Sequence, residues 1–204
     1  GNEDYVQIYA NGQWNDLAFG GSAKSIIEVN LCPVVDAGIN QSICPGTSAT
    51  LTASNTLFGS SPYSYQWTNG APTQSTSVTP ASTTTYGVLS TDTYGCMAGD
   101  TVVVTVYENP TVVVPANDTV CDGGTITATN YTSTTPGATF DWINDNTSIG
   151  LAASGTGDIA SFSATNSTAA IITANITVTP TANGCIGTPS TYSITVNPTP
   201  TVVV

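Results

Sequence analysis

The sequence predicts an all-β protein built from tandem antiparallel β-sandwiches, and three observations support that prediction. NPTVVV at 109–114 returns as TPTVVV at 199–204, a spacing of 90 residues. Between these marks, β-branched residues alternate with polar ones in short segments separated by Gly, Pro, Asn and Asp, as in half-buried strands. No segment has a convincing helical period. Repeats of 77 to 90 residues, measured between equivalent positions, with several short strands each are typical of a β-sandwich.

The two repeats match feature by feature. In order, the first contains Cys44, a strand at 47–54, aromatic residues at alternate positions (Tyr63, Tyr65, Trp67), a strand at 83–90, a turn with Cys96 and a strand at 101–107. The second contains Cys121, a strand at 124–130, Phe140 and Trp142, alternating apolar residues (Ile172, Ala174, Ile176, Val178), a turn with Cys185 and a strand through Tyr192, Ile194 and Val196. We expect Trp67 and Trp142 to face the sandwich interior rather than to stack on sugars.

Threonine marks the start of the repeats. Residues 1–46 contain none, whereas the following 158 residues contain 37. We therefore predict four parts: a distinct N-terminal segment (1–30), a first sandwich (31–110), a second sandwich (111–200) and the first strand of a further repeat (201–204).

Charge excludes several function classes. The chain has one Lys or Arg, 13 carboxylates and no His, for a formal net charge of −12. A nucleic-acid binder needs cations against phosphates, and His-dependent catalysis or ligation is impossible within these residues. No apolar run approaches the roughly 18 residues that span a bilayer, so we expect no membrane insertion. The sequence shows no catalytic machinery, and we expect no enzyme.

Specific strings extend the prediction to a family. ICPGTSATLTA and TTTYGVLSTDTYGCMAGDTVVVTV in the first repeat, and VNPTP closing the second, resemble the Ig-like or PKD-like repeats of large Bacteroidetes surface proteins exported by type IX secretion. The resemblance implies Ig-like sandwiches in an extracellular adhesin, a gliding-motility protein or a multidomain secreted enzyme. It implies no activity of the repeats themselves.

The five cysteines predict disulfides and an unpaired thiol. Cys44 and Cys96 occupy places in the first repeat equivalent to those of Cys121 and Cys185 in the second. We therefore expect the pairs Cys44–Cys96 and Cys121–Cys185, with buried free thiols as the alternative. Cys32 is left unpaired, or bonded to a group outside this sequence. Disulfides indicate an oxidising compartment, which agrees with a secreted, cell-surface location.

The N-terminal segment is unlike the repeats. Alternation from Tyr5 to Tyr9, an Asn-Gly pair at 11–12 and a following Trp14 predict a β-hairpin, with a further strand at 25–29. The acidic GNED string, GQWNDL and the final IIEV resemble the C-terminal part of a C-type lectin-like domain. The resemblance implies that residues 1–30 form a β-hairpin-rich fragment of such a domain.

That resemblance implies a calcium site. It assigns Glu3, Asn15 and Asp16 as ligands of a Ca²⁺ ion that in turn holds sugar hydroxyls. Carboxylate and amide oxygens suit Ca²⁺, but three ligands fall short of its usual six to eight. The family's Glu-Pro-Asn motif is absent from this sequence. The alternative is that Trp14 anchors a core and that its two polar neighbours make turn hydrogen bonds.

Two Asp-Thr-Val strings suggest modification. They resemble the O-glycosylation sequence of exported Bacteroidetes proteins and make Thr101 and Thr119 candidate modified residues, against the alternative of ordinary strand and linker threonines.

Together these features predict a non-enzymatic segment of a large secreted adhesin, in which disulfide-stapled sandwiches form a stalk or fibre that displays adhesive modules. The expected partners are glycans or surface polymers, neighbouring repeats of the chain, and copies of itself in a filament. No cofactor is required, apart from calcium if the lectin-like site is complete. A calcium-dependent carbohydrate-binding module and the accessory domains of a secreted hydrolase are the alternatives.

Overall fold

The computed structural model describes residues 5–8, 14–17 and 32–200. The chain divides into two compact units, Gly1–Val106 (unit 1) and Tyr107–Val204 (unit 2). Within the described residues every element is a strand, apart from one 3-10 turn at Thr147–Ile149. The predicted all-β fold class is confirmed.

Unit 1 begins with a hairpin of β1 (Tyr5–Ile8) and β2 (Trp14–Leu17), which pair antiparallel as the sequence predicts. The predicted Asn-Gly turn and the predicted strand at 25–29 lie outside the described residues. The sandwich strands of the unit are β3 (Val34–Asp36), β4 (Gln41–Ile43), β5 (Ala49–Thr52), β6 (Ser54–Leu57), β7 (Ser64–Trp67), β8 (Ser75–Val78), β9 (Thr84–Thr91) and β10 (Met97–Val106).

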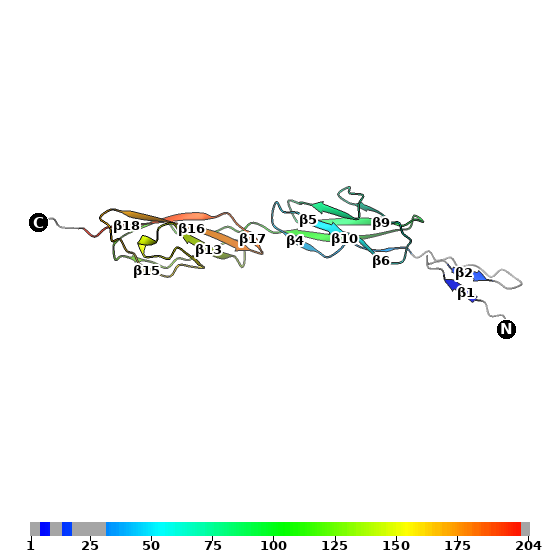
Figure 1. The fold of residues 1–204 in the computed structure, drawn as a ribbon, viewed down its shortest axis with the longest axis horizontal. Coiled ribbons are helices and arrows are strands. Elements are labelled where there is room, and N and C mark those ends of the chain that lie inside the picture. The colour runs from blue at the N-terminus through cyan, green and yellow to red at the C-terminus, as the bar shows by residue number, and fades with distance from the viewer. Residues whose placement is uncertain (1–4, 9–13, 18–31, 201–204) are drawn as a thin grey trace. The chain divides into compact units, whose positions relative to one another are not determined.

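One layer of this sandwich is a four-stranded sheet in the order β4-β10-β9-β7, and the strand pairs β3-β6 and β5-β8 supply the opposite side (Figure 1). Alternate residues along the strands face inward, as the pleat requires. The core includes Leu51, Trp67, Val88, Val102 and Val104. Trp67 is 1% exposed, so its predicted inward position is confirmed.

Unit 2 has the same order of central strands, with β14 and β17 added. Its elements are β11 (Asp118–Cys121), β12 (Thr125–Ile126), β13 (Thr139–Asn144), η1 (Thr147–Ile149), β14 (Ser154–Thr156), β15 (Phe162–Ser163), β16 (Ile172–Ala182), β17 (Cys185–Ile186) and β18 (Ser190–Asn197). The main sheet runs β11-β18-β16-β13-β14, with β17 paired to β16, and β12 pairs with β15 (Figure 1). Trp142 is buried in the core with Ile176, Val178 and Ile194, as predicted.

The register shows that the repeat is exact along the central strands. Trp67 pairs with Val88 between β7 and β9, and Trp142 pairs with Val178 between β13 and β16. In both units the early strand, β4 or β11, lies parallel to the last strand, β10 or β18. The sequence predicts antiparallel sandwiches, and this parallel pair is an addition to that pattern. In unit 1 the first segment pairs with β6 through β3 and then with β10 through β4. In unit 2 it forms a bridge from Val113 to Thr132 and then pairs with β18 through β11.

Candidate functional sites

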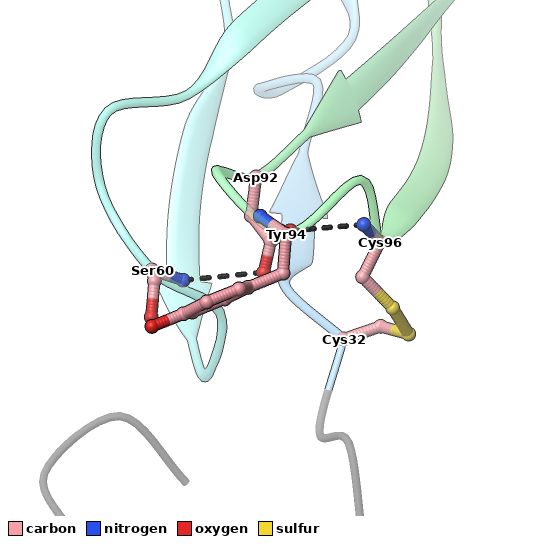
Figure 2. The surroundings of a disulfide bond; sticks show 5 residues. All are labelled: Cys32, Ser60, Asp92, Tyr94 and Cys96. Carbon is pink, nitrogen blue, oxygen red and sulfur yellow. Dashed lines mark hydrogen bonds between the residues drawn. A yellow bond between two sulfur atoms is a disulfide. The ribbon is translucent and has the colours of Figure 1, made fainter. Parts of the chain in front are cut away.

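A disulfide joins the start of the unit 1 sandwich to the turn before its last strand. Cys32 immediately precedes the buried Pro33, and Cys96 lies between β9 and β10. Their Cα atoms are 5.3 Å apart, and 64 positions separate them in sequence. Figure 2 shows the bond beside Asp92 and Tyr94. The disulfide therefore fastens the arriving chain to one end of β10.

Asp92 organises the turn beneath this bond. Its side chain, on a residue only 8% exposed, accepts hydrogen bonds from the backbone N–H groups of Tyr94 and Cys96, both at 2.9 Å, and of Ser60 at 3.3 Å (Figure 2). The Thr93 N–H also donates to the Ser60 carbonyl. A buried carboxylate with several N–H donors is well satisfied, so the turn carrying Cys96 is held rigidly against the neighbouring loop.

The structure corrects the predicted pair Cys44–Cys96. Cys96 is bonded to Cys32, so the prediction that Cys32 is unpaired is wrong as well. The reason is the parallel pairing of β4 with β10. Ile43, the residue before Cys44, pairs with Val106, whereas Cys96 precedes Met97 at the other end of the ten-residue β10. Ten strand residues span about 30 Å, whereas disulfide-bonded Cα atoms lie within about 7 Å.

The same geometry corrects the predicted pair Cys121–Cys185. Cys121 pairs with Asn197 at the end of β18, whereas Cys185 precedes the start of that strand. Cys121 is an exposed free thiol. Neither Cys44 nor Cys185 is a free thiol.

The predicted calcium ligands lie at the N-terminal end of the chain. Asn15 and Asp16 are in β2, where they pair with Gln7 and Val6 of β1. Glu3 lies outside the described residues. Among the described residues, no group of three or more His, Cys, Asp or Glu side chains is arranged to hold a metal ion.

The two candidate glycosylation threonines are both accessible. Thr101 is exposed on β10 and pairs with Gly87, and Thr119 is exposed on β11 and pairs with Thr195. Thr101 also borders an open hollow of 460 Å³ on the outer face of the sheet. The floor of this hollow includes Gly87 and Gly99, which have no side chains to fill it.

Sequence reasoning missed a pair of asparagines with the same role in both units. The Asn40 side-chain oxygen accepts a hydrogen bond from the Val103 N–H at 2.8 Å, and the Asn117 side-chain oxygen accepts one from the Ser193 N–H at 2.8 Å. Each Asn immediately precedes the strand that runs parallel to the last one. We call these two bonds the asparagine clasps. The signal in the sequence is an Asn four residues before each of the equivalent cysteines, Cys44 and Cys121.

A tyrosine pair distinguishes the core of unit 2. The Tyr131 and Tyr192 hydroxyl oxygens are 3.0 Å apart, and both residues belong to the buried cluster. Burial raises the pKa of Tyr131, and burial together with the neighbouring Tyr131 hydroxyl raises the pKa of Tyr192. Both hydroxyls are therefore held in the neutral form, which suits a structural hydrogen bond in the core.

The fold defines a class of protein: a chain with tandem Ig-like β-sandwich domains stabilised by at least one disulfide. In the part of the chain that the structure describes, no helix is long and apolar enough to cross a membrane.

The second sandwich, residues 118–200, matches a family described as the PKD-like domain. No curated protein matches the chain. Among solved structures, an I-band fragment of titin aligns at 13% identity and a TM-score of 0.47, over 82% of this chain and 66% of that one. Immunoglobulin domains 1–4 of Sidekick-1 align at 17% identity and a TM-score of 0.43, over 81% of this chain and 49% of that one. The N-terminal Ig1–2 module of the Drosophila receptor protein tyrosine phosphatase DLAR aligns at 13% identity and a TM-score of 0.32, over 82% of this chain and 100% of that one. The chain thus spans about two thirds of the titin fragment and half of the Sidekick-1 fragment.

Proposed function

We propose that this chain is a non-enzymatic, load-bearing stalk segment of a secreted cell-surface adhesin, as the resemblance of its repeats implies. The observation that supports this function is the parallel pairing of the early strand with the last strand in both units. This arrangement occurs once in each sandwich, between a strand near its start and its last strand.

Parallel terminal strands resist force applied to the ends of a domain. Pulling the early and last strands in opposite directions slides one along the other, so several ladder hydrogen bonds are loaded together rather than one after another. In unit 2 four residues of β11 pair with β18, and the Asn117 clasp adds a bond to Ser193 beside them. In unit 1 three residues of β4 pair with β10, with the Asn40 clasp in the equivalent place.

Single-molecule force spectroscopy on the full chain, held at its two ends, tests this proposal. We expect two separate unfolding events, one for each sandwich, and a lower force for one of them in Asn117→Ala because a bond at the loaded strand pair is lost. Asn69→Ala is the matched control, because it removes two exposed hydrogen bonds away from the terminal strands, one donated to Thr76 and one accepted from the Ala71 N–H. Extension without force peaks, or equal forces in all three proteins, would contradict a load-bearing role.

A calcium-dependent carbohydrate-binding role is the second candidate, and the hairpin favours it. β1 and β2 form an antiparallel pair, and β2 contains Asn15 and Asp16, two of the calcium ligands that the resemblance to C-type lectin-like domains implies. In this proposal the adhesin binds glycans or surface polymers through its lectin-like module. Neighbouring repeats of the same chain, and further copies of it in a filament, are its structural partners. Calorimetric titration of calcium into the chain extended upstream, with Asp16→Ala as control, tests this role, and the absence of heat at millimolar calcium would exclude it.

The adhesin proposal also places the protein outside the cell, exported by type IX secretion, and makes it a glycoprotein. Thr101 and Thr119 are exposed on strands, where a modifying enzyme can reach them. Intact-protein mass spectrometry of the chain from its native source, compared with Thr101→Val and Thr119→Val, measures the modification directly. A native mass equal to the polypeptide mass would contradict it.

A further inference from the structure

The turn after the early strand carries a cysteine in both units. In unit 1 Cys44 directly follows β4, and the Thr47 N–H donates to the Cys44 carbonyl at 3.1 Å. In unit 2 Cys121 ends β11, and the Gly124 N–H donates to the Cys121 carbonyl at 2.8 Å. The third residue of each turn is a glycine with a positive φ, 79° in unit 1 and 74° in unit 2. The two cysteines therefore occupy the same place in the same kind of turn.

The two cysteines differ in their bonding. Cys44 is disulfide-bonded, whereas Cys121 is an exposed free thiol. The other three cysteines of the chain are disulfide-bonded as well, and all five lie in the part of the chain that the structure describes. This sequence therefore leaves no cysteine for Cys121, and any disulfide partner of its thiol comes from outside the 204 residues.

The position of Cys121 leaves room for such a partner. Among the described strands β11 is an edge strand of the main sheet, so no neighbouring strand covers its second side. Exposed and half-buried residues alternate along β11, and Cys121 is on the exposed side with Thr119. A Cβ atom at Gly123 would meet no atom within 4 Å, so the space beside the turn is open. A disulfide requires Cα atoms within about 7 Å of each other, and a second backbone can come that near here.

The turn that carries Cys121 is also held in place. The Asp122 N–H donates to the Asn197 carbonyl and the Gly123 N–H to the Ala164 carbonyl, both at 2.9 Å. The Asp122 side chain accepts a hydrogen bond from the Asn166 N–H at 2.8 Å. A thiol presented by a fixed turn loses little conformational freedom when it bonds, which favours one defined partner geometry.

We propose that Cys121 forms a disulfide with a cysteine of another folded domain, either in a second copy of this chain or in a different protein segment. The disulfide-bonded Cys44 in the equivalent turn of unit 1 is the observation that supports this role. The role is independent of the load-bearing function proposed above.

The bond forms by thiol–disulfide exchange, with a protein disulfide or a low-molecular-weight disulfide as the oxidant. The Cys121 thiolate attacks one sulfur of the oxidant and releases a thiolate. The partner cysteine, also as a thiolate, then attacks the Cys121 sulfur of this mixed disulfide and releases the second thiolate. Two cysteine thiols are thereby oxidised to one disulfide, while the oxidant is reduced to two thiols that take up the two protons.

Non-reducing peptide mapping of the full-length protein from its native source tests the proposal. Free thiols are alkylated with iodoacetamide before digestion, and no reductant is added. We expect loss of alkylation at Cys121, whose peptide is instead linked to a second cysteine-containing peptide. The linked peptides of Cys32 and Cys96 are the internal control. A partner peptide identical to that of Cys121 assigns the bond to a second copy, and one absent from this sequence assigns it to another domain.

Cys121→Ser, produced in the same source, is the matched variant. We expect its partner cysteine to lose the bond and to become alkylated.

Two results would overturn the proposal. In the first, Cys121 of the native protein is alkylated while Cys32 and Cys96 stay linked. In the second, Cys121 is linked only to a low-molecular-weight thiol such as glutathione. Neither result affects the force measurement, so failure of this proposal is distinguishable from failure of the load-bearing function.

Discussion

The two units fasten the arriving chain to the turn before the last strand in different ways. In unit 1 the Cys32–Cys96 disulfide makes the connection covalently. In unit 2 the fully buried Pro110 lies against Gly187, between β17 and β18, and a Cβ atom at Gly187 would overlap the Pro110 carbonyl and come within 2.8 Å of Pro180 Cγ. The Gly187 N–H donates to the Pro180 carbonyl, which fixes this turn to β16.

The difference shows that the repeat preserves a mechanical requirement rather than a particular bond. A sandwich whose first segment crosses between its two sheets needs that segment held at both ends. At the far end both units use an asparagine clasp, and at the near end one uses a covalent bond and the other close packing. Equivalent substitutions at the near end should therefore have different effects in the two units, because the bonds there differ. Equivalent substitutions at the clasps should destabilise each unit by a similar amount.

The largest expected effect is loss of the disulfide in unit 1. In Cys32→Ser/Cys96→Ser, the chain-entropy model for a loop of this length gives a loss of about 4 kcal/mol in unfolding free energy. Hydrogen exchange of β10 amides reports unit 1, and that of β18 amides reports unit 2. We expect faster exchange in β10 only. Cys121→Ser, which removes the exposed free thiol, is the control and should change neither.

Gly187→Ala should have the next largest effect, confined to unit 2. The added methyl group meets the Pro110 backbone, which cannot rotate away as a flexible side chain does. We expect a loss of about 3 kcal/mol, measured by exchange of β18 amides. The control is Gly99→Ala in β10, where the nearest atom is an ordinary 3.4 Å away. Equal behaviour of the two variants would show that unit 2 does not depend on this packing.

The fold was more predictable from the sequence than the disulfides were. Period-two alternation and the paired Trp67 and Trp142 reflect burial, which the local sequence encodes directly, and both tryptophans are buried as predicted. Disulfide connectivity depends on which strand ends meet. The equivalence of Cys44 with Cys121 was visible, but the parallel pairing that places Cys44 far from Cys96 is a long-range property of the two sheets.

The candidate functional residues also differ in how far the sequence predicts them, according to whether their environment is local or long-range. The exposure of Thr101 and Thr119 follows from strand alternation, whereas the asparagine clasps join residues 63 and 76 positions apart. Sequence reasoning finds such a bond only by comparing the repeats, because Asn before a strand has many other local uses.

The clasps should give effects of similar size in both units. Asn40→Ala and Asn117→Ala each remove an exposed hydrogen bond, in which water can take the place of the lost acceptor, and we expect losses of about 0.5 to 1 kcal/mol in unit 1 and unit 2 respectively. Thermal or chemical unfolding of each variant measures this. Asn40→Asp and Asn117→Asp keep an acceptor oxygen and should recover most of the stability. A loss in only one unit would show that the shared clasp is not a shared requirement.

The smallest effect concerns pH and belongs to unit 2. Folding raises the pKa of both Tyr131 and Tyr192, so the folded state holds their protons more tightly than the unfolded state, where tyrosine ionises near pH 10. The stability contributed by the pair is therefore complete below about pH 10 and falls as the pH rises above it. Exchange or unfolding measurements from about pH 9 to 11 should show that the stability of unit 2 falls more steeply with pH in the unmodified protein than in Tyr131→Phe/Tyr192→Phe. The double variant has no hydroxyl at these two positions to ionise. An equal slope in the two proteins would mean that the pair ionises without unfolding the core, and that this difference between the units has no consequence for stability.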